Sequence, residues 1–252
     1  MIEFDDNDER RFALTPFARR FAWFMRLIAF PPVELYFKVI HRARAIGLEN
    51  IPKEGGALLC ANHQAWADTM LIPVTCLERW KTRPFLSPAK EELFKVPLLG
   101  TMIRLWGAFP VKRRQRDLEA MKRIAYYARN YPVMLFPEGT RSKTGKLLRG
   151  RAGVGWIAYS ARTTVIPTLV INTELYPTSR RGNRWFGVPY TVVYGEPLDL
   201  TSYYDRPESK ETSQAISDEI MRAIATLREK YKDLSVNPPL LGDPSAPVAD
   251  EA

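Results

Sequence analysis

Short apolar runs alternate with longer amphipathic stretches along most of the chain. The apolar runs are bounded by Gly, Pro or polar residues and predict buried strands at 44–49, 56–61, 83–87, 106–111, 132–137, 164–171 and 188–195. The stretches between and after them predict helices at 68–78, 88–104, 115–131, 151–162 and 211–232, with Pro97 breaking the second into two pieces. This alternation predicts an α/β fold: a mixed, mostly parallel sheet flanked by helices.

The last predicted helix has a simple pattern. Ile216, Ile220, Ile224 and Leu227 fall on one face and charged residues on the other. We therefore expect a packing helix without chemistry.

The segment 10–44 differs in composition from the rest, because large aromatic residues alternate with arginines. Pro31-Pro32 interrupts it and predicts two short helices, an N-terminal amphipathic hairpin. No apolar stretch reaches the roughly 18–20 residues that span a bilayer, whereas arginine beside aromatic bulk suits an interfacial helix. The alternative is ordinary packing against the rest of the fold. The residues expected to dock on a membrane are Phe17, Arg19, Arg20, Phe21, Trp23 and Phe24.

These patterns divide the chain into four parts. Residues 1–9 are expected to be disordered, 10–44 form the hairpin, 45–233 form the α/β domain, and 234–252 form a proline-rich disordered tail.

Charge and cysteine content narrow the partners and the compartment. The 252-residue chain has a net charge of +9, which favours an anionic partner such as a nucleic acid, an anionic membrane or a phosphorylated substrate. Cys60 and Cys76 lie in apolar runs without metal-ligand spacing, which favours a reducing cytosolic compartment. The acidic N-terminus predicts that no signal peptide is present.

Candidate chemistry begins where the strand at 56–61 ends. His63 and Asp68 lie five residues apart at the point where ligands bind in open α/β sheets. A carboxylate that orients an imidazole makes a general base. Alternatively, Asp68 is only the N-cap of the next helix.

A second motif, Phe-Pro-Glu-Gly-Thr-Arg-Ser at 136–142, follows the apolar run 133–136 about seventy residues later. Asn-His-x4-Asp followed by this motif resembles the glycerolipid acyltransferase family, whose best-known members are 1-acylglycerol-3-phosphate acyltransferases. The resemblance covers roughly 46–200, and it implies an O-acyltransferase of phospholipid biosynthesis. Its N-terminal hairpin is also similar to the membrane-docking N-terminus of some family members.

The chain carries no local signature of a Ser or Cys nucleophile beside His63. We therefore expect direct transfer: His63, oriented by Asp68, deprotonates the acceptor hydroxyl, which attacks an acyl thioester. The resemblance implies acyl-CoA or acyl carrier protein as donor and the sn-2 hydroxyl of 1-acylglycerol-3-phosphate as acceptor, giving phosphatidate. No cofactor or metal is expected, because two separated histidines make no ligand set.

The acceptor phosphate needs cations and backbone N–H groups, and arginine matches phosphate bidentately. The resemblance assigns phosphate and glycerol binding to Arg113, Glu138, Gly139, Thr140 and Arg141. Arg149 and Arg151 precede a predicted helix start and are further candidates for anion binding.

Three roles stay open from the sequence. Glu138 either binds a glycerol hydroxyl or orients an arginine. Lys90 is a candidate oxyanion stabiliser by resemblance, or an ordinary charge in a first helical turn. The apolar segment 96–103 either lines the acyl-chain site or is core.

Two other functions are compatible with parts of this pattern. Another lysophospholipid or glycerol-3-phosphate could be the acceptor within the same family. A basic nucleic-acid-binding module would use the clusters 112–116 and 180–184, but no recognition helix, zinc spacing or aromatic platform accompanies them, so no nucleic acid is expected. The preferred location is the cytoplasmic face of a membrane, as a peripheral or monotopic protein with a lysophospholipid acceptor.

Overall fold

The structure, a computed structural model, describes residues 12–13, 15–76, 79, 84–112, 117–176 and 186–236. At 17–19, 21–22, 25–27 and 29 only the backbone is described. The predicted disordered segment 1–9 and most of the predicted tail lie outside these residues. The tail's first residues, 234–236, are described: the Asn172 side chain donates to the Leu234 carbonyl at 3.0 Å and accepts from the Val236 N–H at 2.9 Å.

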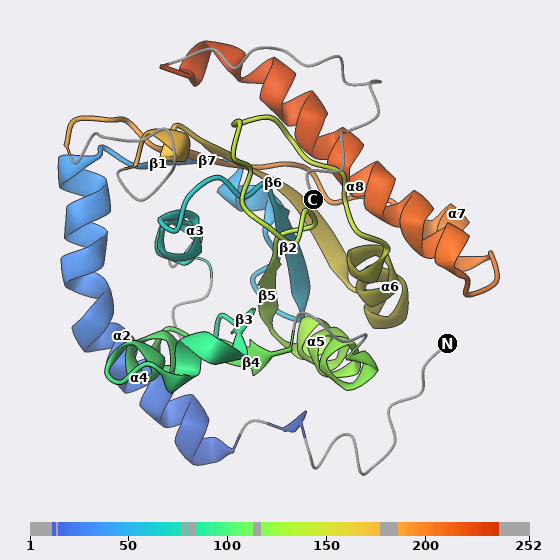
Figure 1. Ribbon diagram of the computed structural model, residues 1–252, viewed down its shortest axis with the longest axis horizontal. Coiled ribbons are helices and arrows are strands. Elements are labelled where there is room, and N and C mark those ends of the chain that lie inside the picture. The colour runs from blue at the N-terminus through green and yellow to red at the C-terminus, as the bar shows by residue number, and fades with distance from the viewer. Residues whose placement is uncertain are drawn as a thin grey trace.

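Strands in the described residues form one twisted surface at the centre of the molecule (Figure 1). Their bounds are β1 Arg44–Ile46, β2 Ala57–Ala61, β3 Ser87–Lys90, β4 Ala108–Val111, β5 Pro132–Leu135, β6 Thr164–Ile171 and β7 Thr191–Tyr194. The main sheet has the order β1-β7-β6-β2-β5, in which only the β6–β7 pair is antiparallel. β3 and β4 pair in parallel, and Leu86 bridges to Val133, which continues the sheet beyond β5. The predicted mixed, mostly parallel sheet is confirmed.

Helices cover both faces of this sheet. Their bounds are α2 Pro16–Leu35, α3 Asp68–Thr75, α4 Leu99–Leu105, α5 Leu118–Asn130, α6 Ala152–Ala161, α7 Thr201–Tyr204 and α8 Lys210–Lys230. In Figure 1, α5, α6 and α8 lie on one side of the strands, and α3 and α2 lie on the other.

The alternation of strand side chains divides the core between these two layers. Leu58 and Cys60 of β2 pack with residues of α5, α6 and α8, including Ile220. Leu59 and Ala61 face the opposite way and pack with α3. Because β2 is buried on both faces, its five residues form an uninterrupted apolar run in the sequence.

The N-terminal segment departs from the predicted hairpin. α2 continues through Pro31 and Pro32 and runs directly into a π-helix, Tyr36–Ile40. Two consecutive prolines remove two backbone donors and bend a helix without having to end it. Packing on both sides holds the helix together here, since Phe30 stacks on Trp106 at 4.1 Å and Phe37 is buried.

The predicted helix 88–104 is also wrong in its first part. Residues 87–90 form β3, a 3-10 turn covers Glu91–Lys95, and α4 begins only at Leu99. Pairing with β4 and the bridge to β5 satisfy this backbone as a strand, so a tertiary contact overrides local propensity. The break expected at Pro97 is confirmed.

α6 and α8 pack against each other at unusually close range, as expected for a packing helix. A Cβ added to Gly155 of α6 would lie 1.7 Å from the backbone oxygen of Ser213 in α8. Gly153, two residues earlier in α6, has room: its nearest neighbour would be Met121 at 3.8 Å.

We predict that Gly155→Ala lowers the free energy of unfolding by about 1–3 kcal/mol, because overpacking pushes the helices apart. Gly153→Ala, the matched control, should be neutral or stabilising by up to about 1 kcal/mol, the helix propensity that Ala adds. Urea unfolding of both variants measures the difference. Equal effects of the two substitutions would contradict the close contact.

Candidate active site

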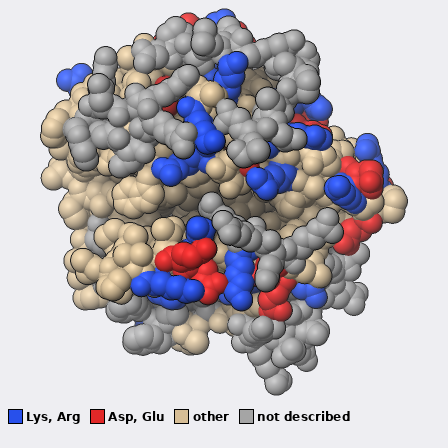
Figure 2. Space-filling view, in the orientation of Figure 1, with Lys and Arg blue, Asp and Glu red and all other residues tan. Residues whose placement is uncertain are grey.

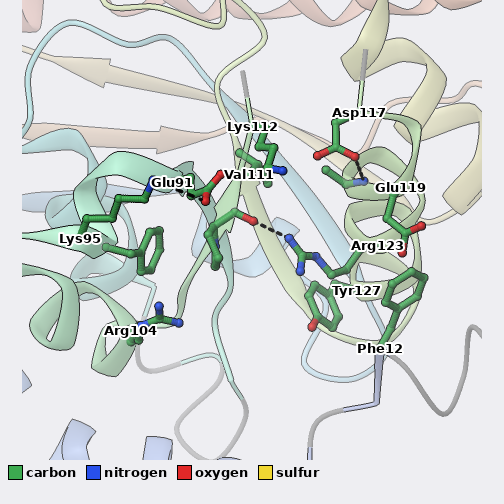
Figure 3. A pocket seen from close by; sticks show the side chains of 13 residues that line it. Phe12, Glu91, Lys95, Arg104, Val111, Lys112, Asp117, Glu119, Arg123 and Tyr127 are labelled. Carbon is green, nitrogen blue, oxygen red and sulfur yellow. Dashed lines mark hydrogen bonds and ion pairs between the residues drawn. The ribbon is translucent and has the colours of Figure 1, made fainter. Parts of the chain in front are cut away.

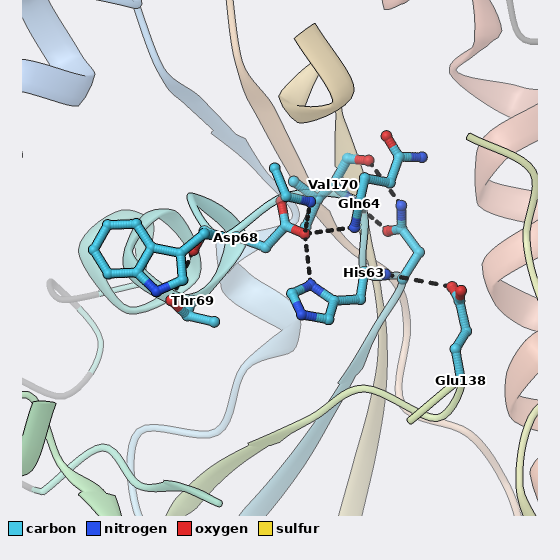
Figure 4. Close-up of polar contacts among 9 residues, drawn as sticks. His63, Gln64, Asp68, Thr69, Glu138 and Val170 are labelled. Carbon is cyan, nitrogen blue, oxygen red and sulfur yellow. Dashed lines mark hydrogen bonds and ion pairs between the residues drawn. The ribbon is translucent and has the colours of Figure 1, made fainter. Parts of the chain in front are cut away.

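The His63 imidazole and the Asp68 carboxylate meet in the loop between β2 and α3. His63 Nδ1 lies 2.9 Å from Asp68 Oδ2, and the same oxygen accepts the backbone N–H groups of Gln64 at 2.7 Å and Ala65 at 2.9 Å (Figure 4). Asp68 is fully buried. Its carboxylate bonds to residues upstream of α3 and not to the helix's own first turn, so it orients His63 and is not merely an N-cap.

This contact fixes the chemistry of the imidazole. A carboxylate oxygen accepts hydrogen bonds, so the contact suits an Nδ1–H that donates to Asp68 and leaves Nε2 as the ring nitrogen that Asp68 does not engage. The ring is held face to face against Phe136, with 3.9 Å between centroids. The structure therefore brings the two predicted residues, His63 and Asp68, into direct contact.

Asn62 anchors the point at which this loop leaves the sheet. Its side chain accepts the Val170 N–H at 2.7 Å and donates to the Val170 carbonyl at 3.1 Å, and it is fully buried. The Asn62 side-chain amide thus makes the two hydrogen bonds to β6 that the backbone of β2 would make if the strand continued. His63 consequently starts from a fixed position at the edge of the sheet.

The second motif lies directly beside His63. The backbone N–H of His63 donates to Glu138 Oε1 at 3.3 Å, and its carbonyl accepts from the Ser142 N–H at 2.8 Å. β2 and β5 pair in parallel and end at the same edge, so the two loops that follow them meet there. Residues about seventy-five positions apart in the chain therefore share one site.

Glu138 is almost completely buried, 2% exposed. Burial raises the pKa of its carboxyl from an ordinary value of 4.5 to about 8. The charge of Asp68 adds to this rise, while the N–H groups of His63 and Leu148 and the charge of Arg228 oppose it.

The following turn, 139–141, is exposed. Gly139 has a φ of 70°, and a Cβ there would lie 2.7 Å from Nε of Arg151. Arg151 Nε donates to the Glu138 carbonyl at 3.2 Å, which holds the turn against the start of α6. Thr140 and Arg141 are exposed. Glycine is thus required here for both conformation and space.

The described contacts do not bring the other predicted site residues to His63. Lys90 ends β3, is half-exposed and pairs with Glu92 at 3.3 Å. β5 separates its strand from β2. Arg149 is exposed on the segment before α6. Arg113 lies outside the described residues.

Arg228 of α8 is a residue of the site region that the sequence reasoning missed. Its guanidinium donates to the Gly145 carbonyl at 2.9 Å, and burial lowers its pKa. The Gln64 side chain donates to the same carbonyl at 3.5 Å. A signal was present: the apolar positions Ile216, Ile220 and Ile224 recur every four residues, and the next position on that face is Arg228.

A separate cavity of about 590 Å³ opens between α4, β4 and α5, and His63 does not line it (Figure 3). Its cations are Lys95, Arg104, Lys112 and Arg123, and its acids are Glu91, Asp117 and Glu119. Lys95 lies 3.9 Å from Glu91, and Arg123 donates to the Pro110 carbonyl. Basic and acidic patches also lie side by side on the face shown in Figure 2. Of the charges that line this cavity, Lys95 and Glu91 thus form an ion pair, whereas Arg123 bonds to a main-chain carbonyl.

The fold and the site agree with one family. A family model described as acyltransferase matches residues 42–171, more than half of the chain, so the chain belongs to the acyltransferase family. It is 30% identical over 173 residues to the chloroplastic 1-acyl-sn-glycerol-3-phosphate acyltransferase LPAT1 of Arabidopsis thaliana, covering 66% of this chain and 46% of that protein. It is 26% identical over 186 residues to the 1-acyl-sn-glycerol-3-phosphate acyltransferase of Borreliella burgdorferi, covering 72% and 71%.

A solved structure supports the fold. The 1-acyl-sn-glycerophosphate (LPA) acyltransferase PlsC from Thermotoga maritima superposes with a TM-score of 0.55 at 24% identity, covering 84% of this chain and 89% of that one. The chain spans about half the length of the chloroplastic relatives that it matches.

The raised pKa of Glu138 predicts a specific pH dependence of stability. Between about pH 4.5 and 8 the folded protein binds more protons at Glu138 than the unfolded chain does. The stability that this proton linkage contributes is complete below about pH 4.5 and is lost as pH rises to about 8. The Glu138→Gln side chain cannot titrate, so the variant should not lose this stability. Between pH 4.5 and 8 the difference in free energy of unfolding, variant minus wild type, should therefore rise by on the order of 3–5 kcal/mol, at about 1.4 kcal/mol per pKa unit.

Urea unfolding of both proteins at pH 5, 7 and 8.5 measures this gap. A gap that stays constant with pH would show that Glu138 titrates at its ordinary value.

Proposed function

We propose that the protein transfers a fatty acyl group from a thioester, acyl-CoA or acyl carrier protein, to the sn-2 hydroxyl of 1-acylglycerol-3-phosphate, giving phosphatidate. The observation that carries this proposal is the His63–Asp68 contact of 2.9 Å at the sheet edge, beside the loop of the second motif. The relatives' names support the acceptor. Another lysophospholipid or glycerol-3-phosphate is the alternative acceptor for the same site.

The proposed reaction needs only the acceptor, the donor and the base. Nε2 of His63 takes the proton of the hydroxyl, whose oxygen attacks the thioester carbonyl carbon. The tetrahedral oxyanion collapses by expelling the thiolate, and the imidazolium returns the proton to that sulfur. The products are an ester and a free thiol. Asp68 stabilises the imidazolium throughout, and the step assigns no role to a metal or cofactor.

The exposed turn after Glu138 suits an anionic acceptor. Gly139, Thr140 and Arg141 face outward beside His63, and a planar guanidinium binds phosphate bidentately. We assign the acceptor phosphate to Arg141 and, by family resemblance, to Arg113. Two arginines favour a phosphate monoester, which carries more charge than a diester.

We predict that His63→Ala lowers acyl transfer by about 10²- to 10⁴-fold, the usual contribution of a general base. The assay supplies labelled oleoyl-CoA with lysophosphatidate, lysophosphatidylcholine, lysophosphatidylglycerol or glycerol-3-phosphate as parallel acceptors, and acyl carrier protein replaces CoA in a second series. Circular dichroism checks that the variant is folded. Full activity in the variant would overturn the assignment of the base, and turnover of a different acceptor would change the substrate alone.

We further propose that α2 lies on the cytoplasmic surface of an anionic membrane. None of the helices in the described part of the chain combines the length and the apolarity that crossing a bilayer would take. Instead, Phe24, Ile28, Leu35 and Val39 are 51%, 56%, 63% and 63% exposed. Phe24, Ile28 and Leu35 follow one another in α2 at spacings of four and seven residues, which place them on one helical face, and Arg20, also exposed, extends it. Val39 follows in the π-helix.

The neighbouring segment adds to this apolar surface. Val96, Leu98 and Met102 are exposed on and before α4, the helix that packs beside α2 (Figure 1). The sequence left 96–103 open between acyl-chain site and core. The exposure of Val96, Leu98 and Met102 favours contact with lipid, either with the bilayer or with the acyl chain of a substrate drawn from it.

We predict that Phe24→Ser with Ile28→Ser lowers binding to vesicles of phosphatidylglycerol and phosphatidylcholine by about tenfold or more. Each apolar side chain that enters lipid contributes about 1.5–3 kcal/mol, and about 1.4 kcal/mol is tenfold. Phe186→Ser is the matched control, because Phe186 is 71% exposed outside α2. Co-sedimentation measures the bound fraction. Unchanged binding of the double variant would argue against docking through α2.

A further inference from the structure

His63 is held by its main chain as well as by its ring. Both backbone polar groups of His63 form hydrogen bonds with the loop 136–142. Glu138 Oε1 accepts the His63 N–H at 3.3 Å, and the Ser142 N–H donates to the His63 carbonyl at 2.8 Å. Only the first of these contacts uses a side chain. Glu138 is thus the one side chain of the second motif that bonds directly to the main chain of the base (Figure 4).

The position of Glu138 does not suit direct contact with an acceptor. The side chain is 2% exposed, and its second oxygen, Oε2, is buried as well. The three residues that follow, 139–141, are exposed. The Glu138 carboxyl is thus shielded from a glycerol hydroxyl in this structure, whereas its contact with the His63 N–H is already made.

We propose that Glu138 is a positioning residue that fixes the main chain of His63, and that it is not a ligand of the acceptor. This inference rests on the proposed function, in which His63 is the base. It differs from both roles that the sequence left open, because the Glu138 carboxyl accepts the His63 N–H, while Arg151 bonds only to the main-chain carbonyl of Glu138.

The physical effect of this contact is on the placement of Nε2. Asp68 and Phe136 fix the orientation of the ring, while the main-chain bonds fix where its Cα lies. An unbonded N–H in this buried loop would draw in water or shift the loop. A displacement of about 1 Å between a base and its proton can cost about 10²-fold in rate.

Glutamine provides a discriminating substitution. It keeps the Oε1 acceptor and the shape of the side chain and removes only the ability to ionise. The pKa of about 8 means that the Glu138 carboxyl is largely protonated at neutral pH, so the amide is also a close match in charge.

Steady-state kinetics with lysophosphatidate separates positioning from binding. We expect Glu138→Ala to lower kcat by about 30- to 100-fold with the KM for lysophosphatidate within about twofold. Glu138→Gln should restore kcat to within about threefold of wild type. Glu196→Ala, an exposed carboxylate just past β7, is the matched control and should match wild type. A rise of tenfold or more in KM for both Glu138 variants, with kcat retained, would overturn the proposal and make Glu138 an acceptor ligand.

A spectroscopic measurement tests the same inference without activity. The chain has two histidines, so labelling of histidine Cε1 gives two NMR signals. His41 is a buried internal standard, whose ring nitrogens contact the Val188 carbonyl and the Tyr36 hydroxyl. We expect Glu138→Ala to shift the His63 signal and Glu138→Gln to leave it near its wild-type position, with His41 unmoved in both. A His63 signal that is the same in wild type and both variants would contradict the proposal.

The two readouts also separate the failures of the two proposals. Wild-type protein that acylates none of the acceptors, yet shows the His63 shift in Glu138→Ala, refutes the proposed reaction and keeps the positioning role. Should Glu138→Ala fail to fold, Glu138→Gln carries the test alone. A loss of kcat in Glu138→Gln, or a shifted His63 signal in Glu138→Gln, would each contradict the positioning role.

Discussion

The Asp68 carboxylate is the interaction on which the site depends. It is fully buried and accepts three N–H donors, one from the His63 ring and two from the backbone that follows it. All three bonds end on Oδ2; hydrogen bonds to charged groups contribute about 1.5–3 kcal/mol each and offset the cost of burying the carboxylate. These bonds hold residues 63–65 against Asp68 and so fix the direction of the His63 ring.

The parallel sheet supplies the second constraint, because it brings two distant loops to one edge. β2 and β5 end side by side, so the loop of the second motif can hold the His63 main chain. Asn62 secures β2 to β6, and Arg228 reaches the Gly145 carbonyl from α8. Contacts from β5, β6 and α8 thus support the segment around His63, as a rigid scaffold must if His63 is the base that we propose.

The arrangement suits a substrate with a charged head and a long apolar chain. His63 is 8% exposed and lies beside an outward-facing turn that carries Arg141, whereas α2 and the start of α4 expose apolar side chains. A lysophospholipid carries both kinds of surface in one molecule. The proposed docking of α2 on a membrane is thus compatible with the proposed reaction, whose acceptor is itself a lipid.

The sequence by itself determined the elements and the candidate site residues that have local patterns. Buried strands read as apolar runs, and His63 with Asp68 and the motif at 136–142 were recognisable by spacing. Tertiary structure alone decided the rest. Residues 87–90 became a strand because β4 and β5 offered partners, α2 continued through its prolines because Phe30 and Phe37 pack, and Glu138 acquired its contact with His63 only when two loops met. The physical reason is that hydrogen bonds and burial between segments far apart in the chain leave no periodic signal in either segment.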